Sequence, residues 1–202
     1  KYLCYCSFLI QKGTKMVQET GKCPVTGLSI VQKPQWTDIR ISDDFMVTFR
    51  MIGDRILHVE PRGHFTKVNL EKAYALLNQV LSESLMLGIK IVEIDDFNNI
   101  SGSSTRSGRI AGIRYFEQKT ENHLGFIAYN MSRQTKLFLH VAWRIHRGPY
   151  KFDIKDNYES AVKHALHMIQ QYDTRDCYNA ANFITRPEWK YQGDSLFTEC
   201  KV

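Results

Sequence analysis

From residue 47 to residue 172, short runs of β-branched and aromatic residues alternate with longer segments whose apolar residues recur every three or four positions. Runs of the first kind predict strands, and the three-to-four spacing predicts amphipathic helices. The predicted elements are, in order, strands at 47–53 and 56–61, a helix at 68–87, a strand at 89–95, a helix ending near 118, a strand at 124–129, a helix at 132–145, a strand at 150–154 and a helix beginning at 156. The first two strands flank a Gly-Asp turn and form a hairpin, whereas each later strand follows a helix. This order predicts an α/β fold with a mixed β-sheet, an initial hairpin and then β-α repeats, covered by helices.

Apolar spacing also predicts which side of each helix is buried. The predicted inward residues are Leu70, Tyr74, Leu77 and Leu81 in the first helix, Ile110, Ile113 and Phe116 in the second, Leu137, Phe138, Val141 and Ile145 in the third, and Tyr158, Val162, Ala165 and Ile169 in the fourth. At the start of the fourth helix, Asp156 and Glu159 have the spacing of a capping box, which predicts Asp156 as the N-cap.

Composition places the chain among globular proteins that carry no membrane span. Hydrophobic residues make up 43% and charged residues 24% of 202 residues, as in an ordinary folded domain. The apolar run at 2–10 is far shorter than the roughly 20 residues that span a bilayer. The five cysteines show no recognisable disulfide framework, and we expect a cytoplasmic protein.

Three segments of the chain are expected. Residues 1–44 are predicted to be an N-terminal extension, in which 1–15 have the character of an artefactual leader because Met16 opens a more ordinary polar sequence. Residues 45–176 are the predicted α/β domain. Residues 177–202 are predicted to be a linker and the first strand of a truncated second repeat, because a basic-Pro-polar-Trp element followed by a strand occurs at both 33–51 and 186–202.

The polar loop between the strand at 89–95 and the next helix is the strongest candidate for a binding site. It joins a strand end to a helix start, where open α/β sheets place ligands and where backbone N–H groups attract anions. The candidate ligand or phosphorylation residues are Ser101, Gly102, Ser103, Ser104, Thr105, Arg106 and Arg109. No Gly-Lys-Ser/Thr closes the loop, which argues against a nucleotide-hydrolysing P-loop. A small anionic ligand is one reading, and simple capping of the helix by these hydroxyls is the other.

A second candidate is a basic face on the helix at 132–145. Arg133, Lys136, His140, Arg144 and Arg147 recur every three or four residues, and 132–155 contain six basic residues and one acidic residue. Such a face can dock an acidic partner, although a merely solvated helix face has the same pattern.

Catalytic and metal-binding motifs are missing from the sequence. It contains no Gly-x-Ser-x-Gly and no His-Glu-x-x-His. His164 and His167 share a helix face, but sequence spacing supplies no third ligand for a metal. The stretch from Cys23 to Gly27 fits turn chemistry better than a reactive thiol. We therefore expect no enzyme, no metal and no cofactor.

The element order resembles the STAS fold of bacterial anti-sigma-factor antagonists over about residues 45–173. The short motifs Cys23-Pro-Val-Thr-Gly-Leu28, Pro34-Gln-Trp36, Ile52-Gly-Asp-Arg-Ile56, Val92-Glu-Ile-Asp95, Ile100-Ser-Gly102 and Leu124-Gly-Phe126 are similar to a tandem STAS-like module that precedes PAS and histidine-kinase regions in bacterial sensor proteins. The resemblance implies a non-catalytic input module of a sensor histidine kinase, acting by ligand or domain–domain binding. Its implied partners are neighbouring PAS or histidine-kinase domains or a regulator protein, and a homodimer is a further expectation.

The resemblance also implies an alternative, a partner-switching protein regulated by phosphorylation. In STAS antagonists the modified serine begins the helix after this strand, and the counterparts here are Ser101 or Ser103. The antagonists place an Asp before that serine, whereas this chain has Ile100 and Gly102. A third class, an adaptor that binds membrane or nucleic acid through the basic face, would show salt-sensitive binding, but we do not expect either partner.

Overall fold

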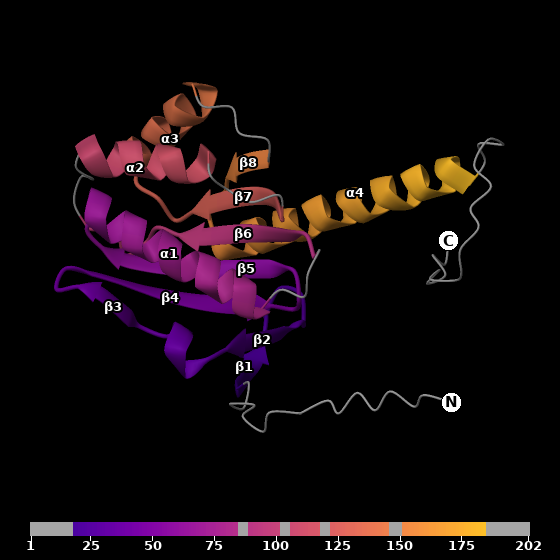
Figure 1. Ribbon diagram of the computed structural model, residues 1–202, viewed down its shortest axis with the longest axis horizontal. Helices are drawn as coiled ribbons and strands as arrows, with labels where there is room; N and C mark the ends of the chain where they lie inside the picture. The colour runs from indigo at the N-terminus through magenta and orange to yellow at the C-terminus, as the bar shows by residue number, and fades with distance from the viewer. Residues whose placement is uncertain (1–17, 85–88, 102–105, 118–121, 146–150, 185–202) are drawn as a thin grey trace, which may run out of the picture.

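The computed structural model describes residues 18–84, 89–101, 106–117, 122–145 and 151–184 (Figure 1). Its strands are β1 (Gln18–Lys22), β2 (Ser29–Gln32), β3 (Ile39–Ser42), β4 (Phe45–Ile52), β5 (Ile56–Gly63), β6 (Ile91–Asp96), β7 (His123–Tyr129) and β8 (Lys151–Ile154). Its helices are the short 3-10 helix η1 (Pro34–Trp36), α1 (Lys67–Ser84), α2 (Arg106–Glu117), α3 (Arg133–Ile145) and α4 (Tyr158–Ile184). Every strand and helix predicted between residues 47 and 172 is present, with shifted boundaries.

The strands form one mixed sheet in the order β1-β2-β4-β5-β6-β7-β8, with β3 also paired to β4. Pairing is antiparallel from β1 to β5 and parallel from β5 to β8. The predicted α/β fold, an initial hairpin followed by β-α repeats, is confirmed by this order. The parallel strands each follow a helix because a chain must cross over the sheet before it can re-enter in the same direction.

The sheet extends into the segment that the sequence set apart as an N-terminal extension. β1 pairs with β2, while β2 and β3 both pair with β4, so residues 18–42 belong to the same sheet as the predicted domain. At the other end, α4 runs to Ile184 and passes the predicted domain boundary at residue 176. Residues 1–15 and the predicted repeat at 186–202 lie outside the described residues.

Alternate residues of the strands point to opposite faces of the sheet, and buried side chains pack on both faces. On one face, Phe49 and Leu57 pack with α1 through Leu77 and Leu81. On the other face, side chains of β4 to β7 pack against α4. The α4 side of this core contains Ala161, Val162, Ala165, Met168 and Ile169. Figure 1 shows α1 in front of the sheet and α4 behind it.

Helix α3 is turned relative to the prediction. Leu137 and Val141, expected to be inward, are 65% and 50% exposed, whereas Leu139 is 7% exposed and packs with Phe126 and Ala128 of β7. Beside its basic face, α3 carries a broad apolar side that includes Leu137, Leu139, Val141 and Trp143, so spacing alone did not identify which of these residues are buried. The contact with β7 determines that Leu139 is buried.

Helix α2 differs from the prediction in the same way. Ile110, expected to be inward, is 45% exposed, while Gly108 and Ala111 are buried. A Cβ added to Gly112 would lie 3.8 Å from the Tyr74 hydroxyl of α1. Small residues therefore bring α2 close to α1, and this approach turns Ile110 toward solvent.

The N-cap of α4 is one residue later than predicted. The Asn157 side-chain oxygen accepts a hydrogen bond from the Ser160 N–H at 2.9 Å, and the Asn157 N–H reaches the Ser160 hydroxyl at 3.4 Å. Asp156 instead accepts a hydrogen bond from Lys136 Nζ at 2.8 Å. The reciprocal cap exists, but Asn157 and Ser160 make it.

None of the helices in the described residues combines the length and the apolar character that crossing a bilayer requires.

Candidate functional site

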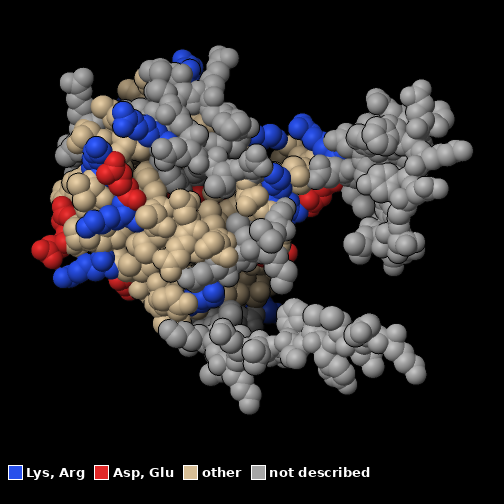
Figure 2. Space-filling model, in the orientation of Figure 1, with Lys and Arg blue, Asp and Glu red and all other residues tan. Residues whose placement is uncertain are grey.

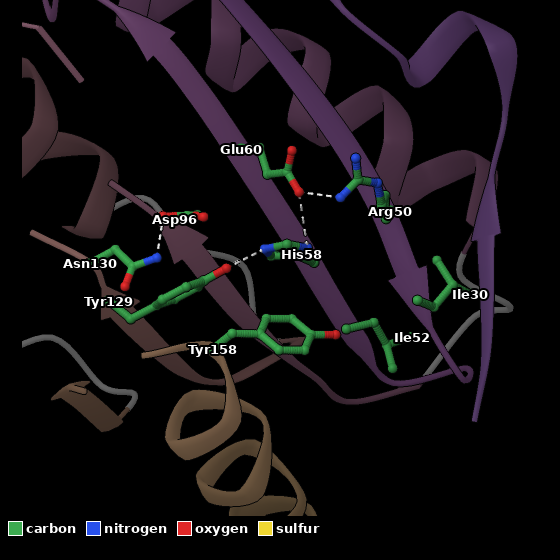
Figure 3. A pocket seen from close by; sticks show the side chains of 9 residues that line it. All are labelled: Ile30, Arg50, Ile52, His58, Glu60, Asp96, Tyr129, Asn130 and Tyr158. Atoms are coloured by element: carbon green, nitrogen blue, oxygen red, sulfur yellow. Dashed lines mark hydrogen bonds and ion pairs between the residues drawn. The ribbon is translucent and has the colours of Figure 1, made fainter. Parts of the chain in front are cut away.

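A polar cavity opens on the α4 side of the sheet, beside the first turn of α4. Its volume is about 280 Å³, and side chains from β2, β4, β5, β6, β7 and α4 line it (Figure 3). The lining residues are Ile30, Arg50, Ile52, His58, Glu60, Asp96, Tyr129, Asn130 and Tyr158. The cavity exists because α4 packs on β6 and β7, while the sheet continues past them to β4 and β2.

Strand register brings the polar lining residues together. Arg50 lies opposite His58 in the β4–β5 pair, and Asp96 is paired with Tyr129 between β6 and β7. Val59 is paired with Asp95, so the next residues of these two parallel strands, Glu60 and Asp96, are neighbours on the α4 face. Residues that are far apart in the sequence thus form one row across the sheet.

His58 lies between a tyrosine hydroxyl and a carboxylate. Its Nε2 is 2.8 Å from the Tyr129 hydroxyl, and its Nδ1 is 3.6 Å from Glu60 Oε1. Burial, with a smaller contribution from the positive charge of Arg50, lowers the pKa of His58 to about 3. The imidazole is therefore neutral at pH 7 and can exchange one hydrogen bond with the phenol. Figure 3 shows His58 between Glu60 and Tyr129.

Glu60 is the most heavily compensated charge in the cavity. Its carboxylate forms an ion pair with Arg50 NH1 and lies 3.6 Å from Arg62 NH2. Arg50 also donates through Nε to Gln32 Oε1 at 3.0 Å. Two of the guanidinium nitrogens of Arg50, NH1 and Nε, are thus engaged by neighbouring side chains, and the charge of Glu60 is balanced inside the protein.

Asp96 has a different environment, because its hydrogen-bond donors are neutral. Asp96 Oδ1 accepts from the Asn98 N–H at 2.9 Å and from Asn130 Nδ2 at 3.0 Å. Asn130 holds a left-handed conformation with φ of 54°, which turns the chain sharply after β7. Burial and the nearby charge of Asp96 raise the pKa of Tyr129, so its hydroxyl stays protonated. No Lys or Arg of the described residues forms an ion pair with Asp96.

Tyr158, at the first turn of α4, closes the cavity on its α4 side. Its hydroxyl lies 3.3 Å from Cys23 Sγ, and burial raises the pKa of the phenol. Cys23 is buried and begins the turn that the sequence predicted: its N–H donates to Leu28 O and its carbonyl accepts from the Gly27 N–H. The turn reading of this segment is therefore confirmed.

Of the loop residues that the sequence singled out, Ser101 is described and does not line the cavity. Ser101 is exposed, and its backbone N–H donates to Gly63 O at 3.0 Å. Gly102, Ser103, Ser104 and Thr105 lie outside the described residues, and Arg106 and Arg109 lie in the first turn of α2. Asp96 connects the cavity with the loop, because it lines the cavity and also accepts a hydrogen bond from the turn that leads to Ser101.

The predicted basic face lies elsewhere, on the outer side of α3. Arg133, His140 and Arg144 are exposed there, Lys136 is half-buried and paired with Asp156, and Arg147 is outside the described residues. Figure 2 shows basic side chains spread over the α1–α3 side of the molecule, while acidic ones gather mainly toward its left edge. The structure does not bring this face together with the cavity.

The two neighbouring histidines of α4 have different partners: His164 contacts a carboxylate, and His167 Nε2 lies 2.8 Å from Gln171 Nε2. His164 Nε2 lies 2.9 Å from Asp153 Oδ2, and Lys155 Nζ binds the same carboxylate oxygen at 2.7 Å. The rings of His164 and His167 have centroids 6.4 Å apart. Within the described residues, no group of three or more His, Cys, Asp or Glu side chains is arranged to hold a metal ion.

Sequence reasoning missed His58, Glu60, Tyr129 and Tyr158. One signal was present: along β4 and β5, Arg50, His58 and Glu60 occupy alternate positions among apolar neighbours. In a hairpin this alternation places the polar residues on one face, and a polar face in the middle of a sheet needs an explanation.

Fold and cavity together define the class, an α/β domain with a mixed sheet and a polar cavity between the sheet and the last helix. No protein-family model matches the chain, and no curated protein matches it. Among solved structures, the chain is similar to an uncharacterized protein of the DUF3478 family with a SpoIIAA-like fold from Shewanella loihica PV-4. The TM-score is 0.46 and the sequence identity is 14%, over 60% of this chain and 93% of that one.

Proposed function

We propose that this chain is a regulatory, non-catalytic domain that works as an input module of a bacterial signal-transduction protein. Its element order, an initial hairpin followed by β-α repeats, resembles that of STAS domains. The observation that carries the proposal is the position of Asp96, which belongs both to the cavity and to the turn that leads into the loop before α2.

The mechanism is a shift between two arrangements of that loop. In the described arrangement, Asp96 fixes the Asn98 N–H, while Gly63 bonds both Asn99 and Ser101. A molecule that takes up hydrogen bonds of Asp96 competes with these contacts and favours a different arrangement. It changes the output only by the difference between its affinities for the two arrangements.

The output surface in this proposal is the outer side of α2 and α3. Three large apolar side chains are exposed there, Ile110, Leu137 and Val141, and Arg133 and Arg144 flank the last two. Exposed apolar residues rimmed by charge are typical of protein–protein contacts. A neighbouring PAS or histidine-kinase domain is the proposed partner, and α2 carries the shift from the loop to it.

Exposure of Ser101 favours one alternative, the phosphorylation-regulated partner switch. A phosphate on this side chain would add about two negative charges beside the start of α2 and could repel or reorient a bound regulator. This alternative differs from the first in one measurable respect, since it requires a covalently modified serine.

Native and denaturing mass spectra of protein expressed in a bacterial cytoplasm test the two readings. The input-module reading expects a non-covalent small molecule that survives only in the native spectrum. Ile30→Trp, which fills the cavity, should abolish that adduct, while Leu28→Trp, a matched exposed position outside the lining, should retain it. A phosphoryl mass that maps to Ser101 or Ser103 would favour the partner switch. A bare polypeptide in both spectra would contradict the small-ligand reading.

A further inference from the structure

We infer that the cavity beside α4 binds a small organic cation, whose ammonium group contacts Asp96 and whose hydrocarbon arm lies against Ile30 and Ile52. The inference names the ligand class of the proposed input module and rests on that function only in treating the cavity as a ligand site. It differs from the small anion expected at the loop.

The charge of the cavity lining carries the inference. The lining contains one guanidinium and two carboxylates, and its imidazole is neutral. Arg50 forms an ion pair with Glu60 and donates a hydrogen bond to Gln32, and Arg62 lies near the Glu60 carboxylate as well. Among the residues that the structure describes, the hydrogen-bond donors to Asp96 are neutral. A half-buried carboxylate that lacks a cationic partner gains most from a ligand that supplies one.

The remaining lining fits the rest of such a ligand. The rings of Tyr129 and Tyr158 meet nearly edge to face with centroids 6.1 Å apart, and the His58 ring is 5.5 Å from that of Tyr158. An ammonium group gains affinity over the face of a tyrosine ring. Ile30 and Ile52 form the apolar part of the lining. A volume of about 280 Å³ lies at the small end of ligand cavities and limits the ligand to a short chain.

An anion would bind less well in the same place, although the whole chain has a formal net charge of +6. Much of the basic excess lies on α2, which packs against α1, and on α3, which packs on β7 from the side of the sheet opposite α4. An anion in the cavity would have to break the ion pair of Arg50 and would approach Asp96. A metal ion is also a poorer fit, because the described residues offer no group of three ligands.

NMR titration with three molecules of equal chain length tests the charge preference. Butylammonium, 1-butanol and butyrate are each added to the full chain, and shifts of resonances from Tyr129, Asn130 and Tyr158 report binding in the cavity. We expect butylammonium to bind at least tenfold more tightly than 1-butanol, and butyrate to bind weakest. Butyrate binding as tightly as butylammonium would overturn the inference, as would the absence of shifts with butylammonium.

Asp96→Asn is the decisive variant because an asparagine keeps the Oδ1 acceptor used by Asn98 and Asn130 and removes only the charge. We expect its affinity for butylammonium to fall about tenfold, as for loss of one charge-assisted hydrogen bond. Asp43→Asn, at an exposed aspartate between β3 and β4, is the matched control and should bind as the parent does. Equal affinity in Asp96→Asn and Asp43→Asn would overturn the inference.

Tyr158 provides a second test that does not depend on the charge. Tyr158→Phe keeps the ring and loses the contact with Cys23, whereas Tyr158→Leu removes the ring. We expect the phenylalanine variant to retain most of the affinity for butylammonium and the leucine variant to lose severalfold. If both variants bind as tightly as the parent, the proposed placement of the ammonium group is wrong.

Hydrogen exchange at 97–101 separates failure of this inference from failure of the proposed function. Butylammonium that binds through Asp96 without changing exchange in this segment supports the inference and contradicts the regulatory mechanism. Butyrate that binds in the cavity and changes the exchange contradicts the inference and leaves the regulatory mechanism intact.

Discussion

The buried imidazole of His58 should make the stability of the fold depend on pH in a predictable way. The folded-state pKa of about 3 lies below the value of about 6.5 that a histidine has in an unfolded chain. Between these two values the unfolded chain binds a proton that the folded chain does not, so the free energy of unfolding falls as the pH falls. From pH 7 to pH 4.5 the loss amounts to about 2.5 kcal/mol for this one group.

His58→Gln isolates that contribution, because glutamine does not titrate and can still hydrogen-bond Tyr129. Urea unfolding is followed at pH 7 and pH 4.5 through tryptophan fluorescence, to which the buried Trp36 contributes, for the parent and for the variant. We expect the parent to lose about 2.5 kcal/mol more than the variant between the two pH values. The figure hardly changes if the folded pKa is 4 instead of 3, because both lie below 4.5. Equal losses in the two proteins would refute the assignment of a buried neutral imidazole.

Three further predictions test the packing that positions the site. Gly63→Ala should lower the free energy of unfolding by more than about 2 kcal/mol, because φ of Gly63 is 103° and a Cβ there would overlap a backbone carbonyl oxygen. A midpoint of urea unfolding that does not change would contradict this backbone geometry. Asn157→Ala should lower the free energy of unfolding by about 1 kcal/mol because it removes the N-cap of α4, and Asp156→Ala should have a smaller effect. A larger effect of Asp156→Ala would mean that Asp156 is the N-cap. Leu139→Ala should lower the free energy of unfolding by about 3 kcal/mol, because Leu139 is buried, whereas Leu137→Lys should leave the melting temperature nearly unchanged. Similar effects at both positions would mean that a different side of α3 faces the sheet.

The alternation from β4 to α4 could be predicted because each element carries its own periodicity. Strands such as β6 are short and β-branched, and α1 shows its buried face in four apolar residues at helical spacing. Neither pattern depends on residues elsewhere in the chain. The topology then follows from a general restriction on parallel connections, which need a crossover segment.

Strands β1, β2 and β3 could not be predicted by the same means. They contain four or five residues each, and β2 has half-buried residues throughout, without a clean alternation. Their strand character comes from pairing with each other and with β4, which is a non-local interaction. Which side of α2 and of α3 is buried also depends on other elements: α2 lies close to α1, and α3 contacts β7.

The candidate cavity was hidden because it depends on strand register. Glu60 and Asp96 are neighbours only because β5 and β6 pair in parallel with Val59 beside Asp95. A shift of that register by one residue would turn Asp96 to the other face of the sheet and leave the cavity without its carboxylate. Spacing along the chain contains no information about such a register.

The loop site predicted from the sequence and the cavity found in the structure are nevertheless connected by one physical rule. Successive residues of a strand point to opposite faces, so Asp95 and Asp96 diverge at the end of β6, one toward the α1 side and one toward α4. The chain that follows Asp96 enters the loop before α2. In the proposed mechanism, a ligand at Asp96 on the α4 side acts through the Asn98 N–H and the turn after it on the loop before α2. By this proposed mechanism, a ligand in the cavity would change what α2 and α3 present to a partner without contacting the loop or the basic helix.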